Sequence, residues 1–127
     1  MSVTVEAPDG STDFWGTTAA QMQTGVTVAN NAITGTLHYI TEGQIVTDWG
    51  AGNFLALHFD DIDPAATTCK VGLDPSAGSG LVALDPDGLA MFKISDKDTQ
   101  KLKVVTTNGA FTGYQTFDLS GLTVEGE

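Results

Sequence analysis

Arginine is absent from this chain of 127 residues, and five lysines stand against sixteen acidic residues, which gives a formal net charge of −11. Direct nucleic-acid binding requires a basic surface, usually with arginines that hold phosphates through two hydrogen bonds. An anionic membrane attracts proteins through the same kind of basic patch. The composition therefore predicts no nucleic-acid partner and no membrane partner, and it suits a highly soluble protein.

Cysteine is almost as scarce, because Cys69 is the only one in the chain. A single cysteine cannot form an intrachain disulfide, which excludes a small secreted scaffold held together by disulfides. We expect Cys69 to be a small buried hydrophobic residue in a strand. Residues Met1–Glu6 lack the features of a signal peptide, and no apolar run reaches transmembrane length. The sequence therefore predicts folding in a cytoplasm.

Long helical patterns are also lacking, and Thr17–Gln23 is the only segment that predicts a helical turn. The length of 127 residues, with 41% hydrophobic residues, predicts a single domain spanning residues 1–127 with a substantial core. Short apolar runs recur about every 8–12 residues between turn signals, without alternating helices. We predict an all-β fold, an antiparallel β-sandwich of immunoglobulin-like or jelly-roll-like type with about nine or ten short strands.

Two pairs of apolar runs separated by turn signals organise the predicted sandwich. Asp-Pro-Asp-Gly joins Leu81–Leu84 to Leu89–Ser95, and an Asn-Gly turn joins Gln100–Thr107 to Phe111–Leu119. Because glycine and asparagine adopt the positive φ of tight turns easily, each pair predicts a β-hairpin. Phe54–Asp60 is a near-continuous apolar run of strand length, which predicts a central strand.

The spacing of the reactive side chains in the sequence matches no catalytic motif. Ser79 lies between two glycines but lacks the glycine spacing and the following helix of a nucleophile elbow. The two histidines are each isolated in a predicted strand, which indicates ordinary strand histidines. Asp60, Asp61 and Asp63 are candidates for a Ca²⁺ site, although aspartates also end strands by capping turns. We predict no enzyme activity, no cofactor and no resident metal.

Aromatic side chains in loops are the remaining candidates for binding. Such side chains stack on sugar rings or anchor protein interfaces, and they also fold back as lids on a core. If the chain is a carbohydrate-binding β-sandwich module, we expect Trp49 and Tyr114 to contact the glycan.

Three stretches of the C-terminal part carry a family resemblance, namely GNFLALHFD (Gly52–Asp60), LVALDPDGLAMFKISDKDTQKLKVV (Leu81–Val105) and FDLSGLTVE (Phe117–Glu125). Together they resemble a group of small all-β proteins of tailed bacteriophages and of prophages in Gram-positive bacteria. These are head-fibre or capsid-decoration proteins. The resemblance is one of general sequence similarity and not of a catalytic motif. It therefore assigns no functional role to any individual residue of this chain.

The resemblance implies a structural virion protein that binds the outer surface of an assembled head, often around a local three-fold axis. The implied partner is the major capsid protein, and the implied state of the chain is a homo-oligomer, with a trimer favoured. Assembly is implied to take place in the host cytoplasm. We hypothesise that the N-terminal strand and the loop after it make the capsid contact, through Val3, Val5, Phe14 and Trp15.

Overall fold

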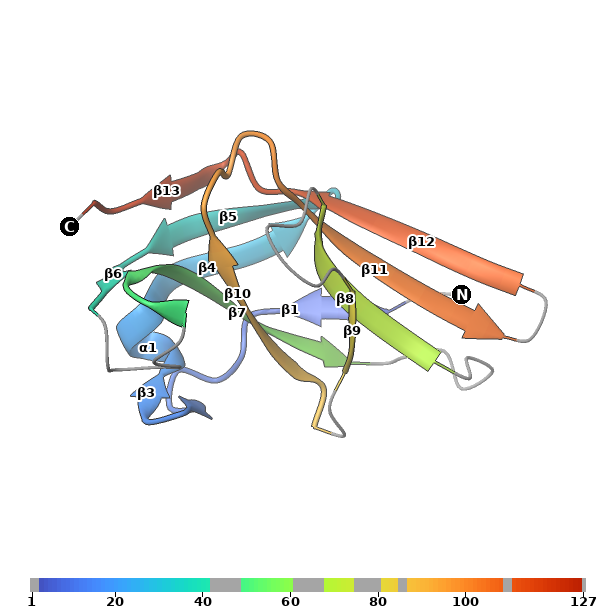
Figure 1. Ribbon diagram of the computed structural model, residues 1–127, viewed down its shortest axis with the longest axis horizontal. Helices are drawn as coiled ribbons and strands as arrows, with labels where there is room; N and C mark the ends of the chain where they lie inside the picture. The colour runs from blue at the N-terminus through green and yellow to red at the C-terminus, as the bar shows by residue number, and fades with distance from the viewer. Residues whose placement is uncertain are drawn as a thin grey trace.

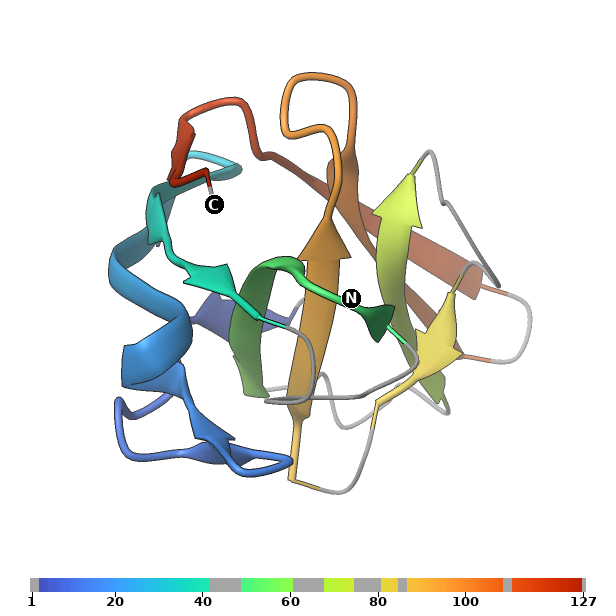
Figure 2. The same ribbon diagram turned by 60° about the vertical axis from the view of Figure 1, so that its left-hand side comes forward.

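The computed structural model describes residues 3–41, 49–60, 68–74, 81–84, 87–108 and 111–126. Within these ranges the predicted all-β sandwich is confirmed, and two sheets face each other (Figures 1 and 2). The elements are β1 (Thr4–Glu6), β2 (Asp13–Phe14), β3 (Thr17–Thr18), α1 (Ala19–Met22), β4 (Gln23–Ala29), β5 (Ala32–Leu37), β6 (Tyr39–Ile40), β7 (Gly52–Asp60), β8 (Thr68–Asp74), β9 (Val82–Ala83), β10 (Leu89–Ile94), β11 (Lys101–Asn108), β12 (Phe111–Asp118) and β13 (Leu122–Val124).

The first sheet has the strand order β1-β7-β10, and β6 also pairs with β7. The second sheet has the order β13-β5-β12-β11-β8-β9, with β4 on the other edge of β5. Strands β2 and β3 form a separate two-stranded ribbon. The pairing is antiparallel as predicted, except that β5 runs parallel to β12 and to β13, which follow one another along the same edge of β5.

Strand β7 is buried on both of its faces. Leu55, Leu57 and Phe59 face the second sheet and belong to the main core. Phe54 and Ala56 point the other way, into a second apolar cluster that also contains residues of α1 and β2. Each of these five residues is at most 2% exposed. A strand covered on both faces needs apolar residues at consecutive positions, which is why the run Phe54–Asp60 correctly predicts a central strand.

The predicted hairpin between Leu81–Leu84 and Leu89–Ser95 is wrong. Strand β9 pairs with β8 in the second sheet, whereas β10 pairs with β7 in the first. Gly88 shows why the turn signal misled. Its φ of 71° is the positive value that the signal predicts. Its carbonyl, however, accepts a 2.7 Å hydrogen bond from the Phe59 amide, so Gly88 lies against β7 and not in a hairpin with β9.

The second predicted hairpin is confirmed. Strands β11 and β12 pair from Lys101 opposite Asp118 to Asn108 opposite Phe111. The helical turn expected within Thr17–Gln23 is confirmed as α1. Its start is capped, because the backbone amide of the N-cap residue Thr18 donates a 2.8 Å hydrogen bond to the Gln21 side chain.

Candidate functional site

Three of the four residues expected to contact a capsid lie in the protein interior. Val3 and Val5 belong to the main core and are 5% and 7% exposed, and Phe14 belongs to the second cluster and is 4% exposed. Their side chains hold the fold together and do not reach a partner's surface. Trp15 is different, because 65% of this residue is exposed. Of the four residues predicted to contact the capsid, Trp15 is therefore the one whose side chain is exposed.

Trp15 stands at the tip of the β2–β3 ribbon. It forms the two-residue loop with Gly16, since Phe14 and Thr17 are already paired. The φ angles of Trp15 and Gly16 are 53° and 88°, and a type I′ turn requires positive φ at both positions. The left-handed region costs a bulky residue about 1–2 kcal/mol. Strain of this kind concentrates at functional sites, where the surrounding structure maintains it.

The two residues expected to contact a glycan have different surroundings. The Trp49 ring stacks on Phe54, with 6.0 Å between centroids and 24° between planes, and it covers the second cluster as a lid. Tyr114 on β12 is 65% exposed, and the Lys103 ammonium of β11 lies 5.2 Å from the centre of its ring. The structure thus leaves Tyr114 largely exposed, with Lys103 over its ring, and places Trp49 against the core.

Phe111 is an exposed aromatic residue that the sequence analysis missed, at 73% exposure. It pairs with Asn108 at the end of the β11–β12 hairpin. Its position two residues after Gly109 of the Asn-Gly turn signal was the available indication, since side chains near a hairpin tip extend beyond the core. The tip of this hairpin and the β2–β3 ribbon lie at opposite ends of the long axis (Figure 1), so Trp15 does not share a patch with Phe111 or Tyr114.

Three ligand-type side chains converge at the edge of the first sheet. Glu6 on β1 lies directly opposite His58 on β7, and Asp60 follows two positions later on the same face. The Nδ1 atom of His58 is 2.9 Å from Oε1 of Glu6. One ligand atom from each of the three side chains lies within 4.8 Å of the other two.

This cluster contains one of the three aspartates that the sequence grouped together. Asp61 and Asp63 lie outside the described residues. The two other ligand-type side chains of this cluster are instead Glu6 and His58, which are 52 positions apart in the chain. That separation explains why spacing alone did not find them.

The second histidine, His38, also contacts a glutamate. Its Nδ1 is bonded to the Glu125 carboxylate, and its Nε2 lies 3.1 Å from the Thr24 hydroxyl oxygen. Within the described ranges, the convergence of a histidine with two carboxylates is found at His58. Each histidine therefore contacts a glutamate, and His58 has a second carboxylate, that of Asp60, close by.

Several of the other aspartates cap turns, as the sequence indicated. The Asp9 carboxylate accepts hydrogen bonds from the hydroxyl and the backbone amide of Ser11, and these lower the pKa of Asp9. The Asp118 carboxylate accepts hydrogen bonds from the Ser120 amide at 3.2 Å and from the Ser120 hydroxyl at 2.9 Å. These two bonds, the amide first, lower the pKa of Asp118.

We expect Asp118 to titrate below the ordinary range of an aspartate. Because its pKa is lowered in the folded state, the associated stability is present above the unfolded-state pKa of about 3.9 and is lost as the pH falls through the folded-state value. NMR titration of the Asp118 carboxyl carbon measures the folded-state midpoint. The variant Ser120→Ala should raise that midpoint. A wild-type midpoint at or above the ordinary range would contradict this assignment.

Cys69 lies half-buried in β8 and packs against the main core. Burial raises the pKa of its thiol, so the thiolate that reacts with electrophiles and metals is disfavoured. Its position in a strand against the core confirms part of the expectation from the sequence, but Cys69 is half-buried and not fully buried as expected.

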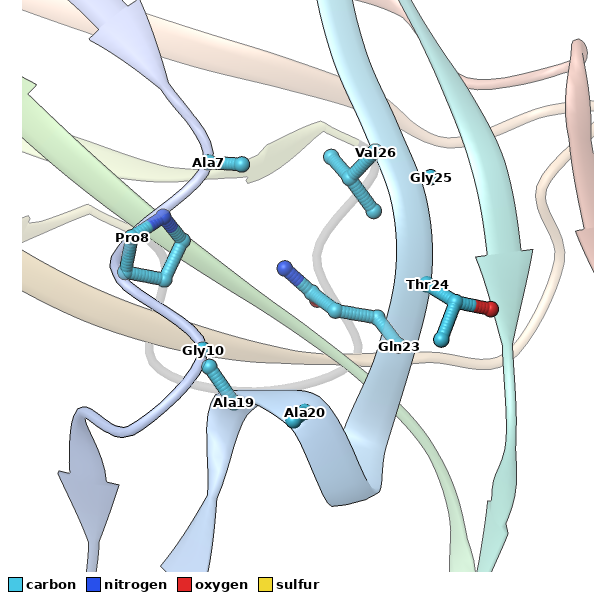
Figure 3. Close-up of a pocket in the computed structure, with 9 residues that line it drawn as sticks. All are labelled: Ala7, Pro8, Gly10, Ala19, Ala20, Gln23, Thr24, Gly25 and Val26. Carbon is cyan, nitrogen blue, oxygen red and sulfur yellow. The ribbon is translucent and has the colours of Figure 1, made fainter.

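A hollow of about 230 Å³ lies between the chain after β1, helix α1 and the start of β4 (Figure 3). Among the described residues, its lining contains no titratable side chain. The amide group of Gln23 is already bonded to the Ala56 backbone through Nε2 at 2.9 Å and Oε1 at 2.8 Å. The hydroxyl of Thr24, which lies 3.1 Å from Nε2 of His38, is the one side-chain hydroxyl among the described lining residues. The lining residues are Ala7, Pro8, Gly10, Ala19, Ala20, Gln23, Thr24, Gly25 and Val26.

Comparison with known proteins finds no family model, no curated protein and no solved structure that matches this chain. Among the described residues, no helix has the length and apolar character needed to cross a membrane. Among the large hydrophobic residues that the structure describes as exposed, Trp15 is the one with a positive φ.

Proposed function

We propose that this protein is a non-enzymatic structural protein of a bacteriophage virion, a capsid-decoration or head-fibre protein that binds the outside of the assembled head. The resemblance of three sequence stretches to that family supports the proposal. The observation that carries it is Trp15, a large aromatic residue held exposed in a left-handed turn. The partner is the major capsid protein, and the protein binds it as a homo-oligomer, with a trimer favoured.

The β2–β3 ribbon holds Trp15 in place before any partner arrives. Phe14 anchors the ribbon in the second cluster, and the Gly16 amide donates a 3.1 Å hydrogen bond to the Asp13 carboxylate. The Ala19 amide also donates a 2.9 Å hydrogen bond to the Thr12 carbonyl at the base of the ribbon. A preorganised tryptophan loses little conformational entropy on binding, and tryptophan is enriched among the residues that dominate interface energies.

Mass spectrometry of purified phage particles tests the virion assignment directly. We expect this chain in intact particles at a copy number comparable to that of the major capsid protein. Its absence from intact particles would reject the virion assignment.

The variant Trp15→Asn tests the contact itself. Asparagine tolerates positive φ better than tryptophan, so we expect the fold to remain at least as stable while the aromatic ring is lost. Binding to purified heads, measured by co-sedimentation, should weaken by at least about tenfold, because loss of a tryptophan that dominates an interface typically costs about 2 kcal/mol or more. Point substitution is the appropriate test, since deleting the N-terminal segment would also remove the buried residues Val3, Val5 and Phe14.

The matched control for this experiment is Tyr114→Ser, which removes an equally exposed aromatic ring on β12, away from the β2–β3 ribbon. This variant should bind heads as the wild type does. Unchanged binding by Trp15→Asn, or an equal loss in both variants, would show that Trp15 is not the contact.

A carbohydrate-binding module is the second candidate, and the exposed Tyr114 ring is the observation that favours it. Sugar rings stack on exposed aromatic faces of this kind. A glycan array probed with the wild type and with Tyr114→Ser distinguishes the two functions. Glycan binding that is lost in Tyr114→Ser would favour the carbohydrate-binding module.

A further inference from the structure

We propose that Glu6, His58 and Asp60 form a binding site for a divalent transition-metal ion of the Zn²⁺ type. The site supplies one imidazole nitrogen and two carboxylate groups from two adjacent strands. It stands apart from the β2–β3 ribbon that carries Trp15, so it does not depend on the capsid-binding proposal.

The strand register brings the three ligands together without a special loop. Glu6 and His58 are directly opposite in the β1–β7 pair, and residues two apart in a strand project from the same face. The backbone under the site is fixed further, because β7 also pairs with β10 on its other edge. Leu89 of β10 lies opposite His58 there, at the margin of the second apolar cluster.

The distances suit a small cation after a minor adjustment. Zn²⁺ binds histidine nitrogen and carboxylate oxygen at about 2.0–2.2 Å, so tetrahedral geometry separates two such ligand atoms by about 3.3–3.5 Å. The observed separation between His58 Nδ1 and Glu6 Oε1 is 2.9 Å, and all three ligand atoms lie within 4.8 Å. An ion therefore enters by replacing the His58–Glu6 hydrogen bond, with small rotations of two surface carboxylates.

The types of ligand select the class of ion. Imidazole suits Zn²⁺ and neighbouring transition metals, whereas Ca²⁺ takes six to eight oxygen ligands and Mg²⁺ retains most of its water. Three protein ligands leave a fourth tetrahedral position for a water molecule. The side chains of His58 and Glu6 are 31% and 49% exposed, so an ion reaches them from solvent.

Metal binding at this site ties the edge strand β1 to the central strand β7. Strand β1 has three residues, and Val5 at its middle packs in the main core. Because all three ligands come together only in the folded chain, the ion stabilises the native state by mass action. At a free Zn²⁺ concentration about 100 times Kd, the thermal midpoint should rise by about 10 °C.

Isothermal titration calorimetry with ZnCl₂ tests the site, alongside thermal unfolding with and without the metal. We expect one Zn²⁺ per wild-type chain, a raised Tm, and no displacement by excess CaCl₂ or MgCl₂. His58→Ala should weaken Zn²⁺ binding by at least about tenfold and abolish the Tm increase, because a ligating nitrogen is lost. Asp60→Asn should also weaken binding.

The matched control is His38→Ala, because His38 is also bonded to a glutamate but has no second carboxylate beside it among the residues that the structure describes. This variant should bind Zn²⁺ as tightly as the wild type. The thermal midpoint of each metal-free variant shows whether it is folded. Equal binding by His58→Ala and wild type, or a loss confined to His38→Ala, would overturn the proposal. Displacement of Zn²⁺ by CaCl₂ at similar concentration would also overturn it, since an ordinary acidic surface would then explain the binding.

Discussion

Replacing Gly88 with alanine is expected to destabilise the protein by about 3–5 kcal/mol, since it combines two unfavourable effects. The φ of Gly88 is 71°, in the left-handed region that side chains with a Cβ rarely adopt. A Cβ atom there would lie 2.3 Å from the carbonyl oxygen of Phe59. That oxygen belongs to the backbone of central strand β7, so it cannot move aside as the end of a flexible side chain would.

Gly25→Ala is the matched control for Gly88→Ala. Gly25 has a similar φ of 65°, but a Cβ atom there would meet no heavy atom within 4 Å. We expect this variant to lose about 1–2 kcal/mol, which is the conformational cost alone. Urea denaturation of both variants measures the free energy of unfolding. A loss in Gly88→Ala no greater than that in Gly25→Ala would show that the close approach to β7 is not tight.

Replacing Gln23 with leucine is expected to destabilise the protein by about 2–5 kcal/mol, because two buried backbone groups lose their partners. Gln23 is 6% exposed, and its side-chain amide bonds both the N–H and the C=O of Ala56. The pairing of β1 with β7 ends at His58, so the Gln23 amide serves as a further rung of the ladder at Ala56. Leucine preserves much of the volume but has no polar group.

Gln115→Leu is the comparison for Gln23→Leu. The Gln115 amide makes the same two-bond contact with the Val3 backbone, at 3.0 and 3.3 Å, in a part-buried setting. Water can replace its bonds, so we expect a smaller loss of about 1 kcal/mol. Urea denaturation gives the two free energies, and hydrogen exchange should show faster exchange of the Ala56 amide in Gln23→Leu. An unchanged Ala56 exchange rate would contradict the role of Gln23 as a rung.

The all-β class and several individual elements were predictable because local physics decides them. The first four residues of the run, Phe54–Leu57, have no polar face, and a strand with that pattern must be covered on both sides, as this part of β7 is. The hairpin of β11 and β12 was predictable because its turn signal joins adjacent strands of the same sheet. In each case the residues that determine the element are close together in the sequence.

The partners of each strand and the composition of each surface cluster depended on contacts between distant residues. The turn signal before Gly88 correctly indicated positive φ, but only tertiary packing placed β10 beside β7 and β9 beside β8. Likewise, Phe14 and Trp15 are adjacent aromatic residues, and the sequence alone does not show which of the two side chains is exposed. The second cluster covers one, and the left-handed turn exposes the other.

By itself the sequence determined that this chain is an acidic, arginine-free, all-β protein with a central strand at Phe54–Asp60 and a hairpin before Leu119. These properties follow from composition and from interactions between neighbouring residues. Only the tertiary structure decided that the side chains of Glu6 and His58 are in contact. It also decided that Trp15 is exposed at the tip of the β2–β3 ribbon while Val3 is buried. Side chains on different strands become neighbours through strand register, and register is settled by the burial of the whole core.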